Sequence, residues 1–344
     1  MMTVRVGMGR FVYEVAEGWG RLPAGWDLVE VSGVAMDSQE RLFVFNRGLH
    51  PVIIFDRDGN FLGSWGEGLF GRAHGIRIGP DNAVYCADDR DHTVRKFTPE
   101  GEWLLTLGVK GQPSNTGYDG HDLLSIRRGG RPFNRPTNIA LGPEGEIYIT
   151  DGYGNARIHK FAPDGRHLLS WGEPGTGPGE FHLPHGICLD GQSLIYAGDR
   201  QNNRIQIFNS QGEFVGQWGD MARPNDLCFD AEGNLYVAEA GHRLGDMPLF
   251  FPCQDTNKAL ELAKSAAGPA SQRVPSRVSI FTPEGQLQAR LGEDDSCAPG
   301  SFLAAHGICV DSRGDLYVAE VTVSATRNAA PPGYHALQKL IRVR

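Results

Sequence analysis

The sequence of 344 residues lacks any apolar run of about 18 residues, the length that a membrane-spanning helix needs. Its first fifteen residues, MMTVRVGMGRFVYEV, also lack the apolar core of a secretion signal. We therefore expect a cytoplasmic protein that has no membrane partner.

Positive charge and paired cysteines are also scarce. The formal net charge is −8, and no basic stripe with interleaved aromatic residues occurs, which disfavours nucleic acid as a partner. The six cysteines form no CxxC pair, so a thiolate metal site or a redox motif is not expected. Four of them stand in apolar strand-like phrases, where a small buried thiol is the ordinary interpretation.

Glycine is abundant, with 46 residues. Much of it stands in short turn phrases, which are DGN at 58–60, PEG at 99–101, PEG at 143–145, PDG at 163–165 and PEG at 283–285. Many short strands joined by such turns predict an all-β fold.

One phrase of fifteen residues recurs six times. It consists of an apolar strand, an Asp- or Gly-rich turn, a second strand and, in most copies, a final acidic residue. The copies span 32–46, 74–88, 137–151, 185–199, 225–239 and 306–320. Most are followed by an R(I/V)xxF strand and a fourth strand, and their spacing starts at about 40 residues, the length of one propeller blade.

We predict one domain over residues 1–344, a six-bladed β-propeller with four antiparallel strands in each blade. Two insertions, 108–136 and 241–276, lengthen the spacing, and the second contains a stretch at 255–268 that predicts a short helix. Each insertion is either a lid or a plain surface loop. A strand at Phe11–Trp19 or at Leu337–Arg344 should complete the last blade and close the ring. The repeat resembles the NHL family of six-bladed propellers.

The first residue of each phrase should lie at one height around the central channel. These residues are Ser32, His74, Thr137, His185, Asn225 and His306. Histidine therefore occupies alternate blades, so three imidazoles should converge on the axis and bind Zn²⁺ or another divalent transition metal. The alternative is that histidine before glycine is only a turn preference of the repeat.

The second strand returns to the same end of the channel. Its acidic last residues should mostly accept backbone N–H bonds, and some should hold the histidines in place. Arg47 and Arg200 come directly after this strand in blades one and four, opposite each other, where they could bind a carboxylate or a developing oxyanion. The alternative for both is a surface salt bridge.

Tyr153 stands one position later in blade three, between Gly152 and Gly154. We expect the glycines to free the backbone so that the phenol points at the metal. A phenol beside a dication and two arginines could then act as a general base. Taken alone, Tyr153 would be explained by loop packing.

These residues resemble those of the peptidyl-α-hydroxyglycine α-amidating lyases, a family of six-bladed propellers with a three-histidine zinc site, a catalytic tyrosine and two functional arginines. The family phrase SDGYxNSRI is similar to TDGYGNARI around Tyr153, HRG to NRG at Arg47, and ADR to GDR at Arg200. The zinc histidines of the family open phrases similar to those at His74, His185 and His306. The resemblance extends over all six blades.

Two departures qualify the resemblance. Where the family has an aspartate that helps to hold a structural calcium, this chain has Gly307, so that calcium is doubtful. Gly154 and Tyr196 replace family cysteines that form disulfides, which agrees with a reducing compartment.

The resemblance implies a metal-dependent lyase that cleaves the C–N bond of an α-hydroxy-amide and releases an aldehyde or keto acid, such as glyoxylate, and an amide. Tyr153 would be the base, and Arg47 and Arg200 would bind the carboxylate or oxyanion of a small-molecule substrate. Two alternatives remain: a metal-dependent hydrolase of the lactonase or esterase type on the same site, and a non-enzymatic NHL scaffold that binds other proteins.

Overall fold

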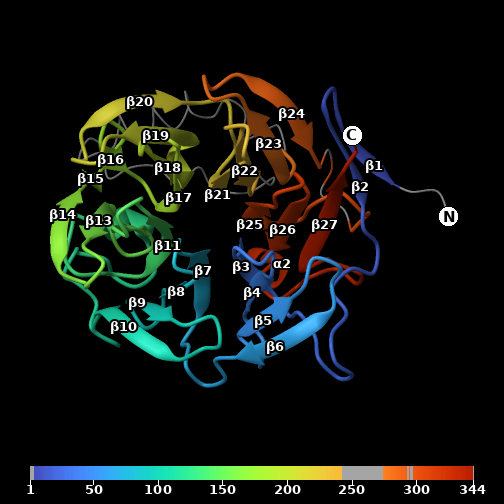
Figure 1. The fold of residues 1–344 in the computed structure, drawn as a ribbon. Helices are drawn as coiled ribbons and strands as arrows, with labels where there is room; N and C mark the ends of the chain where they lie inside the picture. The colour runs from blue at the N-terminus through green and yellow to red at the C-terminus, as the bar shows by residue number, and fades with distance from the viewer. Residues whose placement is uncertain (1–3, 242–273, 293, 295–296, 344) are drawn as a thin grey trace.

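The computed structural model describes residues 4–241, 274–292, 294 and 297–343. Six sheets stand around a central channel as the blades of a propeller (Figure 1), so the predicted all-β, six-bladed fold is confirmed. Within the described residues, no helix has the length and apolar character needed to cross a membrane.

Each of the first five blades is a four-stranded antiparallel sheet whose first strand lines the channel. Blade one contains β3 (Val31–Met36), β4 (Leu42–Asn46), β5 (Val52–Phe55) and β6 (Phe61–Trp65). Blade two contains β7 (Ala73–Ile78), β8 (Val84–Asp88), β9 (Thr93–Phe97) and β10 (Trp103–Gly108). Blade three contains β11 (Pro136–Leu141), β12 (Ile147–Asp151), β13 (Arg157–Phe161) and β14 (His167–Trp171).

Blades four and five follow the same pattern. Blade four contains β17 (Pro184–Leu189), β18 (Ile195–Asp199), β19 (Arg204–Phe208) and β20 (Phe214–Trp218), and the 3₁₀ helix η2 (Arg200–Asn202) follows β18. Blade five contains β21 (Pro224–Phe229), β22 (Leu235–Glu239), β23 (Arg277–Phe281) and β24 (Leu287–Leu291). The short strands β15 (Glu173–Pro174) and β16 (Glu180–Phe181) pair in parallel between blades three and four.

The sixth blade uses both ends of the chain, whereas the sequence analysis expected one of them. It contains β25 (Ala305–Val310), β26 (Leu316–Glu320), β27 (Leu337–Arg342), β2 (Phe11–Val15) and β1 (Arg5–Met8), with the short helix α2 (Thr322–Ala325) after β26. The N-terminal strand β2 pairs with the C-terminal strand β27 (Figure 1). This pairing closes the ring and covers the edge that β27 would otherwise expose.

The hydrophobic core lies between neighbouring blades. Each sheet is covered on both faces, so the inner strands are buried at nearly every residue, as in β4. Between blades one and two, for example, Phe43 and Phe45 pack against Ile76 and Phe97. Five similar clusters complete the circle. Because every core is shared by two blades, the ring fixes the position of every channel-lining residue.

The two insertions differ in what is described. Residues 109–135 run over blade three as a loop with one 3₁₀ turn, η1 (Leu123–Ser125). This loop is tied to the Tyr153 loop, because the Thr116 hydroxyl donates to the carbonyl of Gly154 over 2.5 Å. The stretch at 255–268, which the sequence predicts to be helical, lies outside the described residues.

Candidate metal centre and its surroundings

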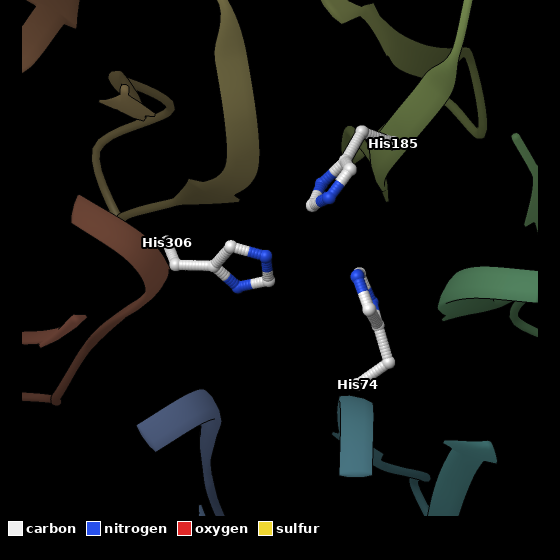
Figure 2. Close-up of side chains that lie close together, drawn as sticks. All are labelled: His74, His185 and His306. Atoms are coloured by element: carbon white, nitrogen blue, oxygen red, sulfur yellow. The ribbon is translucent and has the colours of Figure 1, made fainter. Parts of the chain in front are cut away.

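Three histidine side chains converge at the centre of the ring (Figure 2). His74, His185 and His306 are the second residues of the first strands of blades two, four and six, and their ring centroids lie 4.8 to 5.0 Å apart. The histidines are 1%, 1% and 4% exposed, and one nitrogen from each lies within 4.8 Å of the others. Among the described residues, this is the single cluster of histidine, cysteine or carboxylate side chains that could hold a metal ion.

The same hydrogen bond orients all three rings. Each Nδ1 donates over 2.6 Å to a backbone carbonyl of the next blade, that of Thr137 for His74, Asn225 for His185 and Ser32 for His306. A proton on Nδ1 leaves the Nε2 lone pair free to act as an acceptor. The expectation that the acidic strand ends hold the histidines is therefore wrong, because backbone carbonyls do so.

The electrostatics keep these imidazoles neutral. Burial, first of all, holds the pKa of each histidine well below its usual range. Nearby arginines lower it further in all three, and neighbouring histidines do so in His74 and His306. Neutral imidazole is the form that binds a transition metal. Three such donors and the open positions around them fit a catalytic zinc site or that of a similar divalent ion.

The Tyr153 side chain lies directly over this centre. Its hydroxyl oxygen is 3.3 Å from Nε2 of His74 and 3.3 Å from Nε2 of His185. Gly152 and Gly154 were expected to make the backbone flexible, but the structure explains them differently: each is packed too closely against a neighbouring segment to carry a side chain. A Cβ on Gly152 would lie 2.1 Å from the carbonyl oxygen of Pro184, and one on Gly154 would lie 2.2 Å from Oδ1 of Asn134.

The acidic ends of the second strands are structural, as the sequence suggested. Asp88, Asp151, Asp199 and Glu320 accept backbone N–H bonds from the loop that leads into the first strand of the same blade. Each therefore fixes the approach to a channel-lining position at one end of the channel. We call this end, where the first strands begin and the second strands end, the mouth.

Arg47 and Arg200 lie at the mouth, as predicted. The backbone N–H of Arg47 donates to the carbonyl of Glu30 over 2.8 Å, and that of Arg200 donates to Leu183 over 3.1 Å. The charge of each arginine lowers the pKa of both His185 and His306. Arg47 also forms an ion pair with Glu30 over 2.6 Å, so a structural salt bridge and a place beside the histidines are both present.

Sequence analysis missed Arg72, a third guanidinium near the histidines. It stands two residues before His74, and its Nη1 donates to Oδ2 of the buried Asp89 over 2.6 Å. The charge of Arg72 lowers the pKa of His74 and His185, and it interacts with Tyr153. Its position in the repeat could have indicated this role, because the residue two before the first residue of each phrase also lies at the mouth.

Below the histidines, an ion pair crosses the channel. Arg77 of blade two binds Asp226 of blade five, and Asp226 also accepts from Asn138 of blade three over 2.8 Å and from the N–H of Ile308 in blade six over 3.1 Å. A cavity of about 390 Å³ lies beyond this pair, at the end away from the mouth, and its lining includes Arg77.

This ion pair also bears on the structural calcium that the sequence analysis called doubtful. A Cβ on Gly307 would lie 2.7 Å from Cα of Gly33, so the ring has no room for a side chain there. Asp226 is already neutralised by Arg77. Both features disfavour a second cation at this level.

Comparison with known proteins agrees with the repeat. The NHL repeat family matches residues 133–161, within blade three. Human NHL repeat-containing protein 3 is 30% identical over 237 residues, which cover 65% of this chain and 62% of that protein. Peptidyl-alpha-hydroxyglycine alpha-amidating lyase 1 of Drosophila melanogaster is 34% identical over 167 residues, 45% of this chain and 28% of that protein. The rat peptidylglycine alpha-amidating monooxygenase is 32% identical over 220 residues, 54% of this chain and 21% of that protein.

Solved structures share the fold at much lower identity. A gluconolactonase from Xanthomonas campestris superposes with a TM-score of 0.58 at 12% identity, covering 99% of this chain and 95% of that one. A virginiamycin B lyase from Staphylococcus aureus gives 0.54 at 12% identity, covering 97% and 88%. Such likeness carries the fold alone. The chain spans less than two thirds of each curated relative named above. It contains a match to the NHL repeat at residues 133–161 and is similar to the peptidyl-α-hydroxyglycine α-amidating lyases.

Proposed function

We propose that this protein is a metal-dependent lyase that cleaves the C–N bond of an N-acyl-α-hydroxyglycine or a similar small α-hydroxy-amide. The observation that carries the proposal is the convergence of three imidazole rings, with the Tyr153 hydroxyl 3.3 Å from Nε2 of His74 and of His185. The similarity to amidating lyases supports the reaction class.

His74, His185 and His306 would hold the metal. When bound, the ion would supply a Lewis acid that makes the substrate hydroxyl easier to deprotonate. The three carbonyls that accept from Nδ1 keep the imidazoles in the required tautomer and orientation. The metal identity is part of the proposal, and zinc suits the donor set best.

Tyr153 would act in its phenolate form, which the bound cation and the arginines would favour, and would accept the proton of the α-hydroxyl group. As the C–O single bond becomes a C=O double bond, the C–N bond breaks. Its electron pair goes to nitrogen, which takes a proton back from Tyr153. The products are an aldehyde, glyoxylate when the carbon bears a carboxylate, and a primary amide. Arg47 and Arg200 would share two tasks, binding the carboxylate and stabilising negative charge on oxygen as it develops.

The test is direct turnover. Purified protein with zinc restored is incubated with an N-acyl-α-hydroxyglycine, and glyoxylate and amide are quantified separately. We expect equal amounts of both products, at a rate above that of the spontaneous reaction. Absence of both products across a panel of acyl groups would reject the lyase.

A hydrolase remains the second candidate, because a metal centre beside a basic side chain can also activate water. The same preparation should therefore be assayed against lactones and simple esters. Turnover of these with no glyoxylate release from the hydroxy-amides would favour the hydrolase. Absence of bound metal and of all turnover would favour the scaffold. The small-molecule substrate and the cytoplasmic location also remain predictions.

A further inference from the structure

Apart from the buried carboxylates that end the second strands, the inner positions of the mouth carry a net positive charge in an acidic protein. The inner rim of the mouth consists of twelve positions, two from each blade. One is the residue two before the first residue of the repeated phrase, and the other is the residue directly after the second strand. Five are arginine, namely Arg47, Arg72, Arg135, Arg200 and Arg223, and two are acidic, namely Glu30 and Asp89, which gives a net charge of +3. The whole chain carries −8. Such a concentration of one sign attracts ligands of the opposite sign.

Two of these arginines lie on the same side of the histidines. Nε of Arg47 donates to the carbonyl of Ala73 over 2.8 Å, so its guanidinium lies against the backbone between Arg72 and His74. Burial lowers the pKa of Arg47, and the charge of the nearby Arg72 lowers it further, as expected for two cations that repel each other. Two guanidiniums placed together at this cost are a common arrangement for binding an anion.

The hydrogen bonds of Arg47 leave one donor open. Its Nη1 donates to Glu30 and to Ser324 over 2.6 and 3.1 Å, and Nε is used as described. The Arg47 side chain is only 10% exposed, and its Nη2 atom is buried and has no hydrogen-bond partner among the described residues. A buried guanidinium nitrogen without an acceptor is costly unless a ligand supplies one.

Arg72 is more accessible. Its side chain is 32% exposed, and Asp89 holds it through Nη1. Asp89 is fully buried behind it, so the carboxylate fixes the guanidinium at the mouth. Arg200 lies across the ring in blade four and has its own buried, unpartnered nitrogen, Nε. The donors on the two sides of the histidines are therefore separate.

We propose that Arg72 and Arg47 together form a carboxylate-binding site beside His74, which fixes the direction of the bound ligand. The carboxylate of the substrate binds at blades one and two, and the acyl-amide part extends toward Arg200 in blade four. The direction of the substrate rests on the proposed function, but the carboxylate site does not require turnover.

The test is calorimetric binding of two inert ligands to the metal-loaded protein. N-acetylglycine carries the carboxylate and lacks the α-hydroxyl group, and N-acetylglycinamide is its neutral counterpart. We expect Arg72→Met to weaken N-acetylglycine binding by about 10- to 100-fold, the effect of losing a charge-assisted hydrogen bond, and to leave the neutral ligand unchanged. Arg72→Lys keeps the charge and should lose less.

The matched control is Arg223→Met, which removes the same charge at the same repeat position in blade five. We expect less than about a threefold effect from it on N-acetylglycine, since only the general field changes. Equal losses in both variants, or no loss in Arg72→Met with a folded protein and unchanged metal content, would overturn the site. If Arg72→Met does not fold, Arg72→Lys against Arg223→Lys makes the same comparison.

The two proposals can fail separately. Carboxylate discrimination at Arg72 without turnover of any hydroxy-amide rejects the lyase and keeps the binding site. Turnover that is insensitive to Arg72, measured as an unchanged KM and kcat, rejects the binding site and keeps the lyase.

Discussion

The two levels of the central channel use different positions of the same repeat for opposite purposes. At the mouth, three neutral imidazoles lie together with the Tyr153 hydroxyl near two of their Nε2 atoms, and Nη2 of Arg47 has no partner among the described residues. One level below, Arg77 and Asp226 are both charged and bound to each other across the ring, with Asn138 and a backbone N–H completing the network.

This difference in hydrogen bonding distinguishes a binding site at the upper level from a structural ion pair, or brace, at the lower level. Buried polar groups are normally satisfied within the protein, and the lower level obeys this rule. The upper level holds its histidines firmly through Nδ1 and leaves the other nitrogens to an external partner. Substitutions at the upper level should therefore affect function, and substitutions at the lower level should affect stability.

The largest effect should come from removing the upper level altogether. We expect the triple variant His74→Ala, His185→Ala, His306→Ala to lose its metal and at least about 100-fold of any lyase activity. Elemental analysis beside the unaltered protein measures the metal, and thermal unfolding checks the fold. Full metal content in the variant would mean that the three histidines are structural.

The second largest effect should distinguish the role of the Tyr153 hydroxyl from that of the metal. Tyr153→Phe removes one hydroxyl over the centre, and we expect kcat to fall by about 10²- to 10⁴-fold, the contribution of a positioned general base. Zinc content should stay the same, because the three imidazoles are untouched. Unchanged kcat would assign Tyr153 to loop packing.

The lower level is tested by unpairing its charges. Arg77→Met leaves Asp226 buried without its cation, and we expect the free energy of unfolding to drop by about 3–5 kcal/mol in denaturant titrations. Metal content should be retained. The double variant Arg77→Met, Asp226→Leu should regain part of the loss, since no charge is left unpaired. Equal stability of the single variant and the unaltered protein would contradict the role of a brace.

The smallest expected effect is on the pH dependence of stability, and it comes from the buried carboxylates that end the second strands. Burial raises the pKa of Asp199 to about 6 although Arg204 binds it, and raises that of Glu320, which accepts from Gln338 and backbone N–H groups, to about 7. The folded state therefore holds the Glu320 proton more tightly than the unfolded chain. Its contribution to stability is present below about pH 4.5 and is lost as the pH rises toward 7.

Glu320→Gln should remove this part of the pH dependence, which amounts to at most about 3 kcal/mol. The buried histidines act in the opposite direction, since their lowered pKa values make the folded state more stable as the pH rises to about 6.5. The informative quantity is thus the difference in unfolding free energy between the variant and the unaltered protein from pH 4 to 8. A difference that does not change with pH would show that folding does not shift the pKa of Glu320.

Much of the site could be read from the repeat because its register is regular. A phrase of constant length places its first residue at one height, so histidine in alternate copies was enough to predict three converging rings. Arg72 was missed because it precedes its phrase, whereas the predicted site residues stand at the start of a phrase or just after its end. The reason for the glycines beside Tyr153 was also wrong, because it depends on Pro184 and Asn134, which approach from other parts of the structure.

The sequence by itself determined the six blades, the alternation of histidine around the channel and the resemblance to the amidating lyases, since each depends on local periodicity and on residue type. Only the tertiary structure decided that both chain ends close blade six, that backbone carbonyls orient the histidines, and that Arg77 and Asp226 meet across the channel. These are contacts between segments far apart in the chain, and their partners are selected by the curvature of the closed ring.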